Sequence, residues 1–412
     1  MSENWLDDLM KETEDVETPR SWIWWSLVST ISAVAANNYY VLSYSGKVKF
    51  RPNMYVMLLG KSGLGKAFPT TLAKLLVTKS EATRVIAGRS SIQAIVQEMG
   101  TSRTNENGKP PFTDARVFII NGELSSAVIA DPDALAILTD LFDGTDLPEW
   151  TNLLKGDGAK KLKDPYITAL FGTSPAHFYD SIPQANIEGG YIGRNLIVYE
   201  EKRYKEIHAF SDDDTIGEQL QDRVVPEYVK HLIEITKHKG RLLLTAEAKT
   251  LYNSWKTEWR SKNIPDKTGF VERVPTHVIK VAMCLALARY EIGERIFESD
   301  IQLAIDKVTA LLYANRRTTE SRGLDPMAAQ TRLVIDFLIQ AKDNELKRKQ
   351  LLSKGQGDYN SYDLDKVLEN LLELGWVERE RFVAGSATDW IIKLSGEPLI
   401  NYRKFVERNS KQ

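Results

Sequence analysis

The chain has 412 residues, enough for two or three domains, and its apolar and charged fractions of 42% and 27% are those of an ordinary globular protein. A formal net charge of −2 excludes a global basic field, so any contact with nucleic acid would need a local basic patch or an oligomer that concentrates one. The one cysteine, Cys284, excludes an internal disulfide framework, and its apolar neighbours predict a buried thiol rather than part of a metal cluster.

The N-terminal region contains an acidic segment and then a long uncharged one. Residues 1–18 are acidic and lack the apolar core of a signal peptide, which predicts a disordered or loosely docked tail on a cytoplasmic protein. The stretch from Ser21 to Gly46 has the length of a membrane span, but two asparagines inside it would be costly at bilayer depth. We therefore expect a buried helix over about 20–37, a strand around 39–44, and no membrane contact.

Short apolar runs that end at turn residues predict four buried strands in the next part of the chain. They are Met54–Gly60, Val117–Ile120, Tyr166–Gly172 and Asn195–Glu200. Helical patterns lie between them, so residues 19–205 are expected to form an α/β core with a mostly parallel sheet. The pattern of residues 206–320 predicts mainly helices. The order helix, helix, two strands over 328–400, with a Gly-Trp step before the strands, is typical of a winged helix.

A glycine-rich run follows the first of these strands and leads into a helical pattern. The pattern G-x-x-x-x-G-K-[ST] is met up to its last position, where Ala67 replaces the hydroxyl. Backbone N–H groups of such a loop and the N-terminus of the next helix bind phosphate, and the lysine reaches the β- and γ-phosphates of a nucleotide such as ATP. The alternative is a strand–helix turn without a ligand. The candidate nucleotide-binding residues are Gly60, Lys61, Ser62, Gly63, Leu64, Gly65, Lys66 and Ala67.

Polar residues at the ends of the later strands are candidates for hydrolysis and for Mg²⁺. The strand in VFIINGEL is followed by Asn121 and Glu123 where a magnesium-binding Asp is usual, so both are candidate metal-binding residues. Either Asn121 or the hydroxyls of Thr70 or Thr71 in the first turns of the helix must take the place of the Asp. Glu123 is suited to polarise the attacking water, and the alternative is a solvated acid.

Two further polar positions each allow a functional interpretation and a purely structural one. The third strand ends in Thr173 and Ser174, whose hydroxyls could sense the γ-phosphate, whereas a simple turn is the alternative. Arg194 follows a glycine-rich loop that could lift it out of the surface toward a neighbouring subunit, where an arginine stabilises transition-state charge. A salt-bridged surface arginine is the other reading.

The motifs GKSGLGK, INGEL, LFGTSP, GGYIGR and ERVPTHVIKVA occur in the order of the AAA+ superfamily. Over residues 20–318 the chain resembles the phage and mobile-element group of helicase-like ATPases, related to superfamily-three viral helicases and MCM proteins. The resemblance implies that residues 206–320 are a helical lid. It also implies a Walker-B glutamate at Glu123 with Asn121 replacing the Walker-B aspartate, sensor one at Thr173 or Ser174, an arginine finger at Arg194, and sensor two at Arg273.

The segment between the second and third strands contains a further clue. EWTNLLKGDGAKKLKDPYITALF could form a hairpin with GDG at its tip. In the helicases that the chain resembles, a hairpin at this position tracks DNA in a central pore, and six copies would focus its charge. A solvated lysine-rich loop is the alternative. The candidate DNA-binding residues are Lys155, Lys160, Lys161 and Lys163.

The resemblance implies a hexameric ATPase that translocates on or unwinds single-stranded or forked DNA in phage-type replication, in the host cytoplasm if phage-encoded. A helicase loader or remodeller and an inactive nucleotide-binding scaffold are the alternatives. The C-terminal helix SYDLDKVLENLLELG is net acidic and would repel phosphates, although Lys347–Gln350 could touch DNA. We therefore expect the C-terminal module to dock a replication protein at least as readily as DNA.

Overall fold

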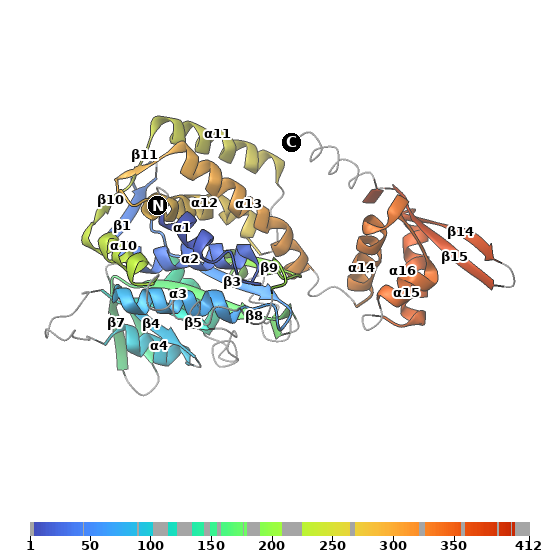
Figure 1. Ribbon diagram of the computed structural model, residues 1–412, viewed down its shortest axis with the longest axis horizontal. Coiled ribbons are helices and arrows are strands. Elements are labelled where there is room, and N and C mark those ends of the chain that lie inside the picture. The colour runs from blue at the N-terminus through green and yellow to red at the C-terminus, as the bar shows by residue number, and fades with distance from the viewer. Residues whose placement is uncertain are drawn as a thin grey trace. The chain divides into compact units, whose positions relative to one another are not determined.

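The computed structural model describes residues 4–43, 45–88, 90–101, 114–121, 134–143, 149–154, 158–175, 177–178, 190–207, 225–263, 268–320, 326–355, 359–384, 387–396 and 398–399. The chain forms two compact units, Met1–Thr319 and Glu320–Gln412, which we call the first and second unit. Figure 1 shows the helices and strands of both units.

A five-stranded, all-parallel sheet organises the first unit, in the order β4-β5-β8-β3-β9. The strands are β3 (Tyr55–Gly60), β4 (Arg84–Ala87), β5 (Arg116–Asn121), β8 (Tyr166–Thr173) and β9 (Asn195–Glu200). The predicted α/β class and parallel sheet are confirmed, with the four expected strands and one that was missed, β4. Since β8 lies between β3 and β5, the chain order reverses around β3, and such switch points are where parallel sheets bind ligands.

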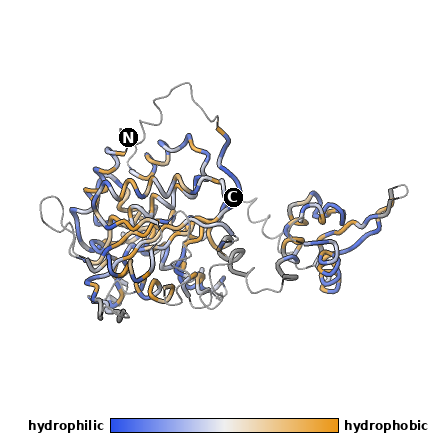
Figure 2. The backbone as a smooth tube through the Cα atoms, turned by 90° about the horizontal axis from the view of Figure 1, so that it is seen from below, coloured by the Kyte–Doolittle hydropathy of each residue, from blue (hydrophilic) through white to orange (hydrophobic). Residues whose placement is uncertain are grey.

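Successive residues of the strands face two separate apolar clusters, so helices cover both sides of the sheet. Val56 and Leu58 of β3 pack into one cluster with several helices, whereas Tyr55, Met57 and Leu59 pack into the other. The first face is covered by α2 (Arg20–Ala35), α3 (Ala67–Ser80) and α12 (Phe270–Ala288), and the second by α4 (Ile92–Met99) and α6 (Ala134–Asp143). Apolar residues run along the strands in the interior (Figure 2).

The uncharged N-terminal stretch folds as predicted, as a buried helix and a strand. In α2 every residue from Trp22 to Ala35 is buried, because α2 packs between the sheet and the helices around it. Ser29 Oγ donates to the Trp25 carbonyl and Ser32 Oγ to the Pro52 carbonyl, both at 2.8 Å, whereas the buried Ser26 Oγ has no hydrogen-bond partner among the described residues. The chain continues through η1 (Ala36–Asn38) into β1 (Tyr39–Leu42). None of the helices in the described residues combines the length and apolar character needed to cross a bilayer.

Residues 1–18 are not the loose acidic tail that the composition predicted. They contain α1 (Trp5–Glu12), whose Trp5, Leu6 and Leu9 are buried to 1% exposure or less. Asn4 caps the helix by accepting from the Leu6 N–H at 2.8 Å, and Trp5 Nε1 donates to the Tyr228 carbonyl at 3.0 Å. Asp7 and Glu12 are exposed, and the half-buried Asp8 accepts from the Tyr290 hydroxyl at 2.9 Å, so the acidic segment contains an amphipathic helix.

Helices beyond residue 206 share the core of the sheet. They are α10 (Val225–Lys237), α11 (Ala246–Lys262), α12 and α13 (Glu298–Glu320). Residues of α10, α12 and α13 belong to the same apolar cluster as α2 and α3, and Cys284 of α12 is buried, as predicted. The short strand β10 (Gly240–Arg241) links this region to the N-terminal part by pairing with β1, which also pairs with β2 (Lys49–Phe50). The strands β11 (Leu243–Leu244) and β12 (Arg295–Ile296) pair with each other.

The predicted hairpin is present between α6 and β8. Strands β6 (Glu149–Leu154) and β7 (Gly158–Lys163) are antiparallel, with Leu154 opposite Gly158. Trp150 and Leu162 face each other and are buried in the second apolar cluster, which fixes the register. The tip and Lys155 lie outside the described residues.

The second unit holds three helices and a three-stranded antiparallel sheet in the order β13-β15-β14, counted over the described residues. The predicted helices and two strands are present as α14 (Pro326–Gln340), α16 (Ser361–Glu373), β14 (Val377–Ala384) and β15 (Ala387–Leu394). The sequence interpretation missed η5 (Lys342–Asn344), β13 (Glu345–Lys347) and α15 (Arg348–Lys354). Leu338, Leu351, Leu364 and Ile392 are among the residues that form its separate core.

Candidate functional site

The glycine-rich run forms a loop between the end of β3 and the start of α3. Gly60 ends the strand where a Cβ would lie 2.6 Å from the Glu200 carbonyl oxygen and 2.7 Å from the Trp22 ring, so no side chain fits. Gly63 and Gly65 have φ values of 85° and 86°, which non-glycine residues rarely adopt. Within the described residues no side chain caps the N-terminus of α3. The result is a loop whose backbone and helix terminus suit an anion.

The Lys66 side chain folds back across the loop toward its first residues. Its Nζ donates to the carbonyl oxygens of Gly60 at 2.7 Å and Lys61 at 2.9 Å, and it stands 5.5 Å from the centre of the Trp22 ring. The ammonium therefore occupies the mouth of the loop, where it would meet the phosphates of a nucleotide. Lys61 and Ser62 are exposed on the outer side of the run, and Leu64 is half-buried.

The missing hydroxyl at Ala67 is not replaced by Thr70. The Thr70 side chain is 5% exposed, and its Oγ donates back to the carbonyls of Lys66 and Ala67, both at 3.0 Å. This corrects the expectation that Thr70 could supply a metal ligand, because its side chain is buried against the helix backbone. Thr71 is exposed.

The ends of β5 and β8 lie beside the loop. Thr173 pairs with Leu59, one residue before Gly60, because β8 is the direct neighbour of β3. Asn121 ends β5 next to Phe171, and its Nδ2 donates to the Gly88 carbonyl at 3.2 Å. The sheet therefore brings the predicted sensor and the predicted metal-binding amide to the same edge as the loop. Glu123, the predicted catalytic base, lies outside the described residues.

Thr173 and Ser174 differ in accessibility. Thr173 is 1% exposed, with its Oγ1 3.4 Å from the Ser174 carbonyl oxygen. Ser174 is half-buried, and its Oγ accepts from the His177 N–H at 3.3 Å, which caps the turn that follows. Both readings of this strand end, sensor and turn, remain compatible with these contacts.

Arg194 lies at the amino ends of the parallel strands, whereas the loop lies at their carboxyl ends. It ends η3 (Ile192–Arg194) directly before β9, and the first residue of β9 pairs with Tyr55, the first residue of β3. Because Gly60 pairs with Glu200, this separates Arg194 from Gly60 by roughly 20 Å along the strand, at about 3.3 Å per residue. Arg194 therefore cannot serve the loop of its own chain in this fold.

The structure corrects the expectation that Arg194 stands out of the surface. It is 7% exposed and forms an ion pair with Asp143, whose side chain is 57% exposed. Its Nε is 3.1 Å from Asp143 Oδ2, and its Nη1 donates to the Gly190 carbonyl at 2.7 Å. The buried guanidinium is thus paired with a largely exposed carboxylate, and without that partner its burial would be costly.

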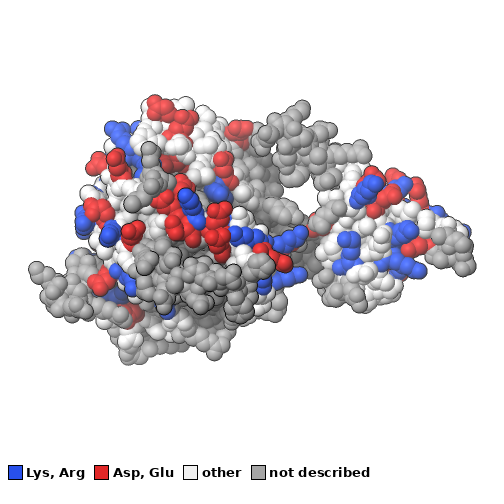
Figure 3. Space-filling view, viewed as in Figure 1, with Lys and Arg blue, Asp and Glu red and all other residues white. Residues whose placement is uncertain are grey.

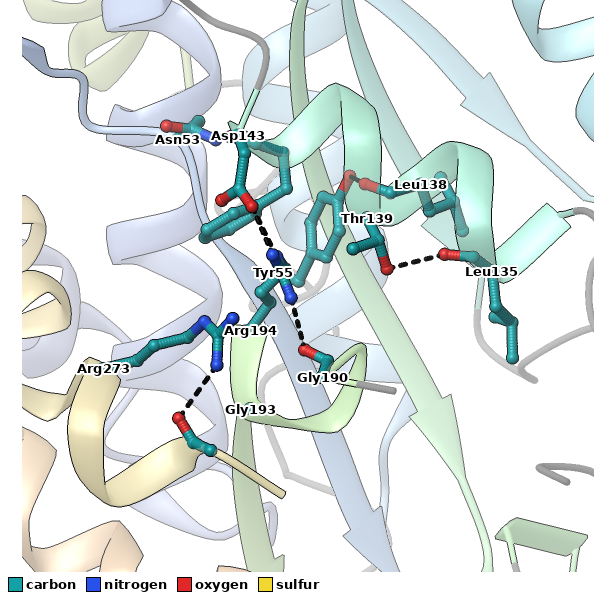
Figure 4. A network of polar contacts seen from close by, with 12 residues as sticks. Asn53, Tyr55, Leu135, Leu138, Thr139, Asp143, Gly190, Gly193, Arg194 and Arg273 are labelled. Carbon is teal, nitrogen blue, oxygen red and sulfur yellow. Dashed lines mark hydrogen bonds and ion pairs between the residues drawn. The ribbon is translucent and has the colours of Figure 1, made fainter. Parts of the chain in front are cut away.

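Arg273 approaches the same place from α12. Its Nη1 donates to the Gly269 carbonyl at 3.0 Å, and a Cβ at Gly190 would lie 2.9 Å from Arg194 Nη1 and 3.5 Å from Arg273 Nη2. The two predicted arginines thus flank Gly190 together (Figure 4). Neither lies at the edge of the sheet that carries the loop.

Buried polar groups connect this arginine pair to the core. Tyr55 donates to the Leu138 carbonyl at 2.7 Å, which ties β3 to α6, the helix that ends in Asp143 (Figure 4). Lys280 of α12 donates to Asn53 Oδ1 at 2.7 Å, and Nε2 of the buried His277 lies 3.1 Å from the Gly193 carbonyl oxygen. Burial lowers the pKa of His277 to about 3, so it is neutral.

The lysines of the hairpin are partly described. Lys161 is exposed and lies 2.9 Å from Glu149, and Lys163 is exposed with its carbonyl accepting from the Ala115 N–H at 2.8 Å. The Lys155 position and the Lys160 side chain lie outside the described residues. Among the described residues on the face in view, acidic side chains lie between the basic ones (Figure 3).

Three residues near these sites were not singled out by the sequence. Thr18 Oγ1 donates to the Gly65 carbonyl at 3.1 Å, Arg203 Nη2 donates to the Gly63 carbonyl at 3.2 Å, and Asp143 holds Arg194. No motif marks them, because each contact joins segments far apart in the chain. Among the described residues, no three His, Cys, Asp or Glu side chains are grouped to hold a metal ion.

A comparison with models of known protein families finds no match for this sequence, and a comparison with curated proteins finds none either.

Proposed function

We propose that the first unit binds ATP at the Gly60–Ala67 loop and hydrolyses it. The observation that carries this proposal is the loop at the switch point of the parallel sheet, with Lys66 across it and the polar ends of two neighbouring strands, Asn121 and Thr173, along the same edge. A plain strand–helix turn would not require two glycines at positive φ and a lysine folded over the loop mouth.

The residues present suit a nucleoside triphosphate with Mg²⁺. The loop N–H groups and Lys66 would hold the phosphates, and Asn121 and Glu123 would face the metal, directly or through water. When bound, Mg²⁺ would neutralise charge that develops on the phosphates. Because Ala67 has no hydroxyl and the Thr70 side chain is buried, the metal has fewer direct protein ligands, so we expect it to be held more loosely than in a standard phosphate loop.

We propose further that the active form is an oligomer, hexameric in line with the AAA+ helicases that the sequence resembles. Arg194 and Arg273 lie together at the edge of the sheet opposite the loop, so only the nucleotide of a neighbouring subunit is within reach. The exposed Asp143 carboxylate that now holds Arg194 would be exchanged for phosphate oxygens.

DNA translocation or unwinding is the motor function we assign to this ATPase. The β6–β7 hairpin supports it, because Lys161 and Lys163 are exposed at its base, which Trp150 and Leu162 anchor in the core. We take α10–α13 as the lid. The order of helices and strands in the second unit supports a winged-helix-like module that docks DNA or a replication protein.

Two variants test hydrolysis and its subunit geometry together. Glu123→Gln should bind ATP without turnover, and Arg194→Ala should also be inactive. An equal mixture of the two should restore activity at about a quarter of the interfaces. At these interfaces Arg194→Ala supplies the intact Glu123 and the neighbouring Glu123→Gln subunit supplies the intact Arg194. Mixtures that stay inactive would contradict a neighbour's arginine, and a wild-type protein without ATPase activity, with or without single-stranded DNA, would refute the motor.

A nucleotide-binding scaffold is a second candidate, favoured by one observation. Thr70 does not replace the hydroxyl missing at Ala67, which weakens the metal site on which turnover depends. ATP binding without hydrolysis under all conditions would support the scaffold. A helicase loader would hydrolyse ATP yet leave a forked duplex intact in the absence of a partner, and strand displacement by the protein alone would exclude it.

A further inference from the structure

Two segments far apart in the sequence meet beside the phosphate loop. The Tyr204 N–H donates to the Glu17 carbonyl at 2.9 Å, the Glu17 carboxylate lies 2.5 Å from Arg203 Nη1, and Lys205 Nζ lies 3.0 Å from Asp15. The Ile207 N–H completes the pairing, at 3.3 Å from Glu17 Oε1. We call this pairing of residues 15–18 with residues 203–207 the clasp.

The clasp touches the loop at two backbone carbonyls. Thr18 Oγ1 donates to the Gly65 carbonyl at 3.1 Å, and Arg203 Nη2 donates to the Gly63 carbonyl at 3.2 Å. The approach is close, since a Cβ at Gly65 would lie 2.6 Å from Thr18 Oγ1. The two glycines held in this way are those with positive φ.

We propose that Thr18 and Arg203 are positioning residues that hold the loop in its phosphate-binding conformation before nucleotide arrives, an inference that rests on the proposed function. A peptide group whose carbonyl is held by a donor outside the loop cannot rotate that oxygen inward, where it would repel phosphate. Each donor also polarises the peptide group it holds, which strengthens the N–H as a donor. A loop ordered in advance loses less conformational freedom when phosphate binds.

An ion pair within the clasp holds the Arg203 side chain beside the loop. The Glu17 carboxylate binds one nitrogen of its guanidinium, which leaves the second nitrogen aimed at the Gly63 carbonyl. A guanidinium suits this task because it presents several donors in a fixed plane. The clasp also makes the N-terminal segment part of the nucleotide site, which the acidic composition of residues 1–18 does not suggest.

Two matched pairs of variants separate loop positioning from the stability of the clasp. Thr18→Val removes the hydroxyl that reaches the loop, whereas Thr13→Val removes a hydroxyl that donates to the Leu9 carbonyl at 2.7 Å. Arg203→Gln removes the contact with Gly63. Lys205→Gln breaks the ion pair with Asp15, which belongs to the clasp but does not contact the loop. Each control thus loses a contact of similar kind in the same region.

Hydrogen exchange of the nucleotide-free protein measures the loop directly and needs no ATP. Peptides that cover residues 60–68 should exchange faster in Thr18→Val and Arg203→Gln than in the wild type and the two controls. In steady-state assays the same two variants should raise KM for ATP roughly three- to tenfold with kcat nearly unchanged, as expected for the loss of one hydrogen bond that acts on binding.

The possible results distinguish the positioning role from the proposed function. Unchanged loop exchange in Thr18→Val and Arg203→Gln, or an equal rise in the controls, would overturn the positioning role. A wild-type protein that binds no ATP, but whose loop exchange responds to the two variants as described, would instead refute the proposed function. Faster loop exchange together with a higher KM, seen in these two variants alone, is the result that supports the inference.

Discussion

Acidification should destabilise the first unit through His277 of α12. Burial lowers the pKa of His277 from 6.5 to about 3, and the positive charges of Lys280, Arg273 and Arg194 act in the same direction. Since the Gly193 carbonyl can only accept, the Nε2 atom 3.1 Å away carries the hydrogen. Nδ1 is buried and has no hydrogen-bond partner among the described residues, so a proton there would gain no partner.

The pKa difference sets the size and the sign of the effect. Between pH 6.5 and pH 3 the unfolded chain holds the His277 proton and the folded chain does not, so the free energy of unfolding falls as the pH falls. At pH 5 the unfolded pKa lies about 1.5 units above the pH, which at about 1.4 kcal/mol per unit amounts to roughly 2 kcal/mol lost relative to neutral pH. Below the folded pKa no further loss arises from this group.

Urea unfolding of the wild type and of His277→Gln at pH 7 and pH 5 measures this contribution. The glutamine amide can still donate to the Gly193 carbonyl but does not titrate, so other groups that respond to pH contribute equally to both proteins. We expect the wild type to lose roughly 2 kcal/mol more than the variant between the two pH values. Equal losses would refute the conclusion that His277 is buried and neutral.

Two more predictions concern polar contacts of the first unit. Pro275 lacks the N–H that would bind the Val271 carbonyl within α12, and Trp259 Nε1 donates to that carbonyl at 3.0 Å instead. Trp259→Phe should therefore cost roughly 1–3 kcal/mol more in the wild type than in a Pro275→Ala background, and equal costs in a double-mutant cycle would contradict this. Asp143→Asn should lower the free energy of unfolding by roughly 1–2 kcal/mol, because Arg194 is buried but its partner is 57% exposed; an unchanged urea midpoint would argue against the ion pair.

The central sheet and its loop were predictable because their signals are local. Strands buried on both faces are continuous apolar runs, and the loop follows one of them directly. The strand β4 was missed because it is a short edge strand and partly exposed, so its sequence carries little apolar signal. The hairpin was predictable from GDG between two segments, and the buried Trp150 and Leu162 explain its register.

Contacts between distant segments were beyond the reach of the sequence. Nothing near Arg194 indicates that Asp143, 51 residues earlier, would hold it at the surface. The helix α1 did carry a signal, because Asn4 is a favoured cap and Trp5, Leu6 and Leu9 have helical spacing, but the acidic composition outweighed it in the prediction. The contact of Thr18 with Gly65 depends on where α1 docks, which local patterns do not specify.

Equilibrium titration of ATP against wild type, Lys66→Ala and Lys61→Ala tests the central claim most directly. Lys61 is the matched control, since it carries the same charge in the same loop but is exposed on its outer side. We predict that the wild type and Lys61→Ala bind ATP and that Lys66→Ala binds at least about tenfold more weakly, as expected when a charged donor to phosphate is lost. Equal affinity of Lys66→Ala and the wild type would contradict the assignment of this loop as a nucleotide site.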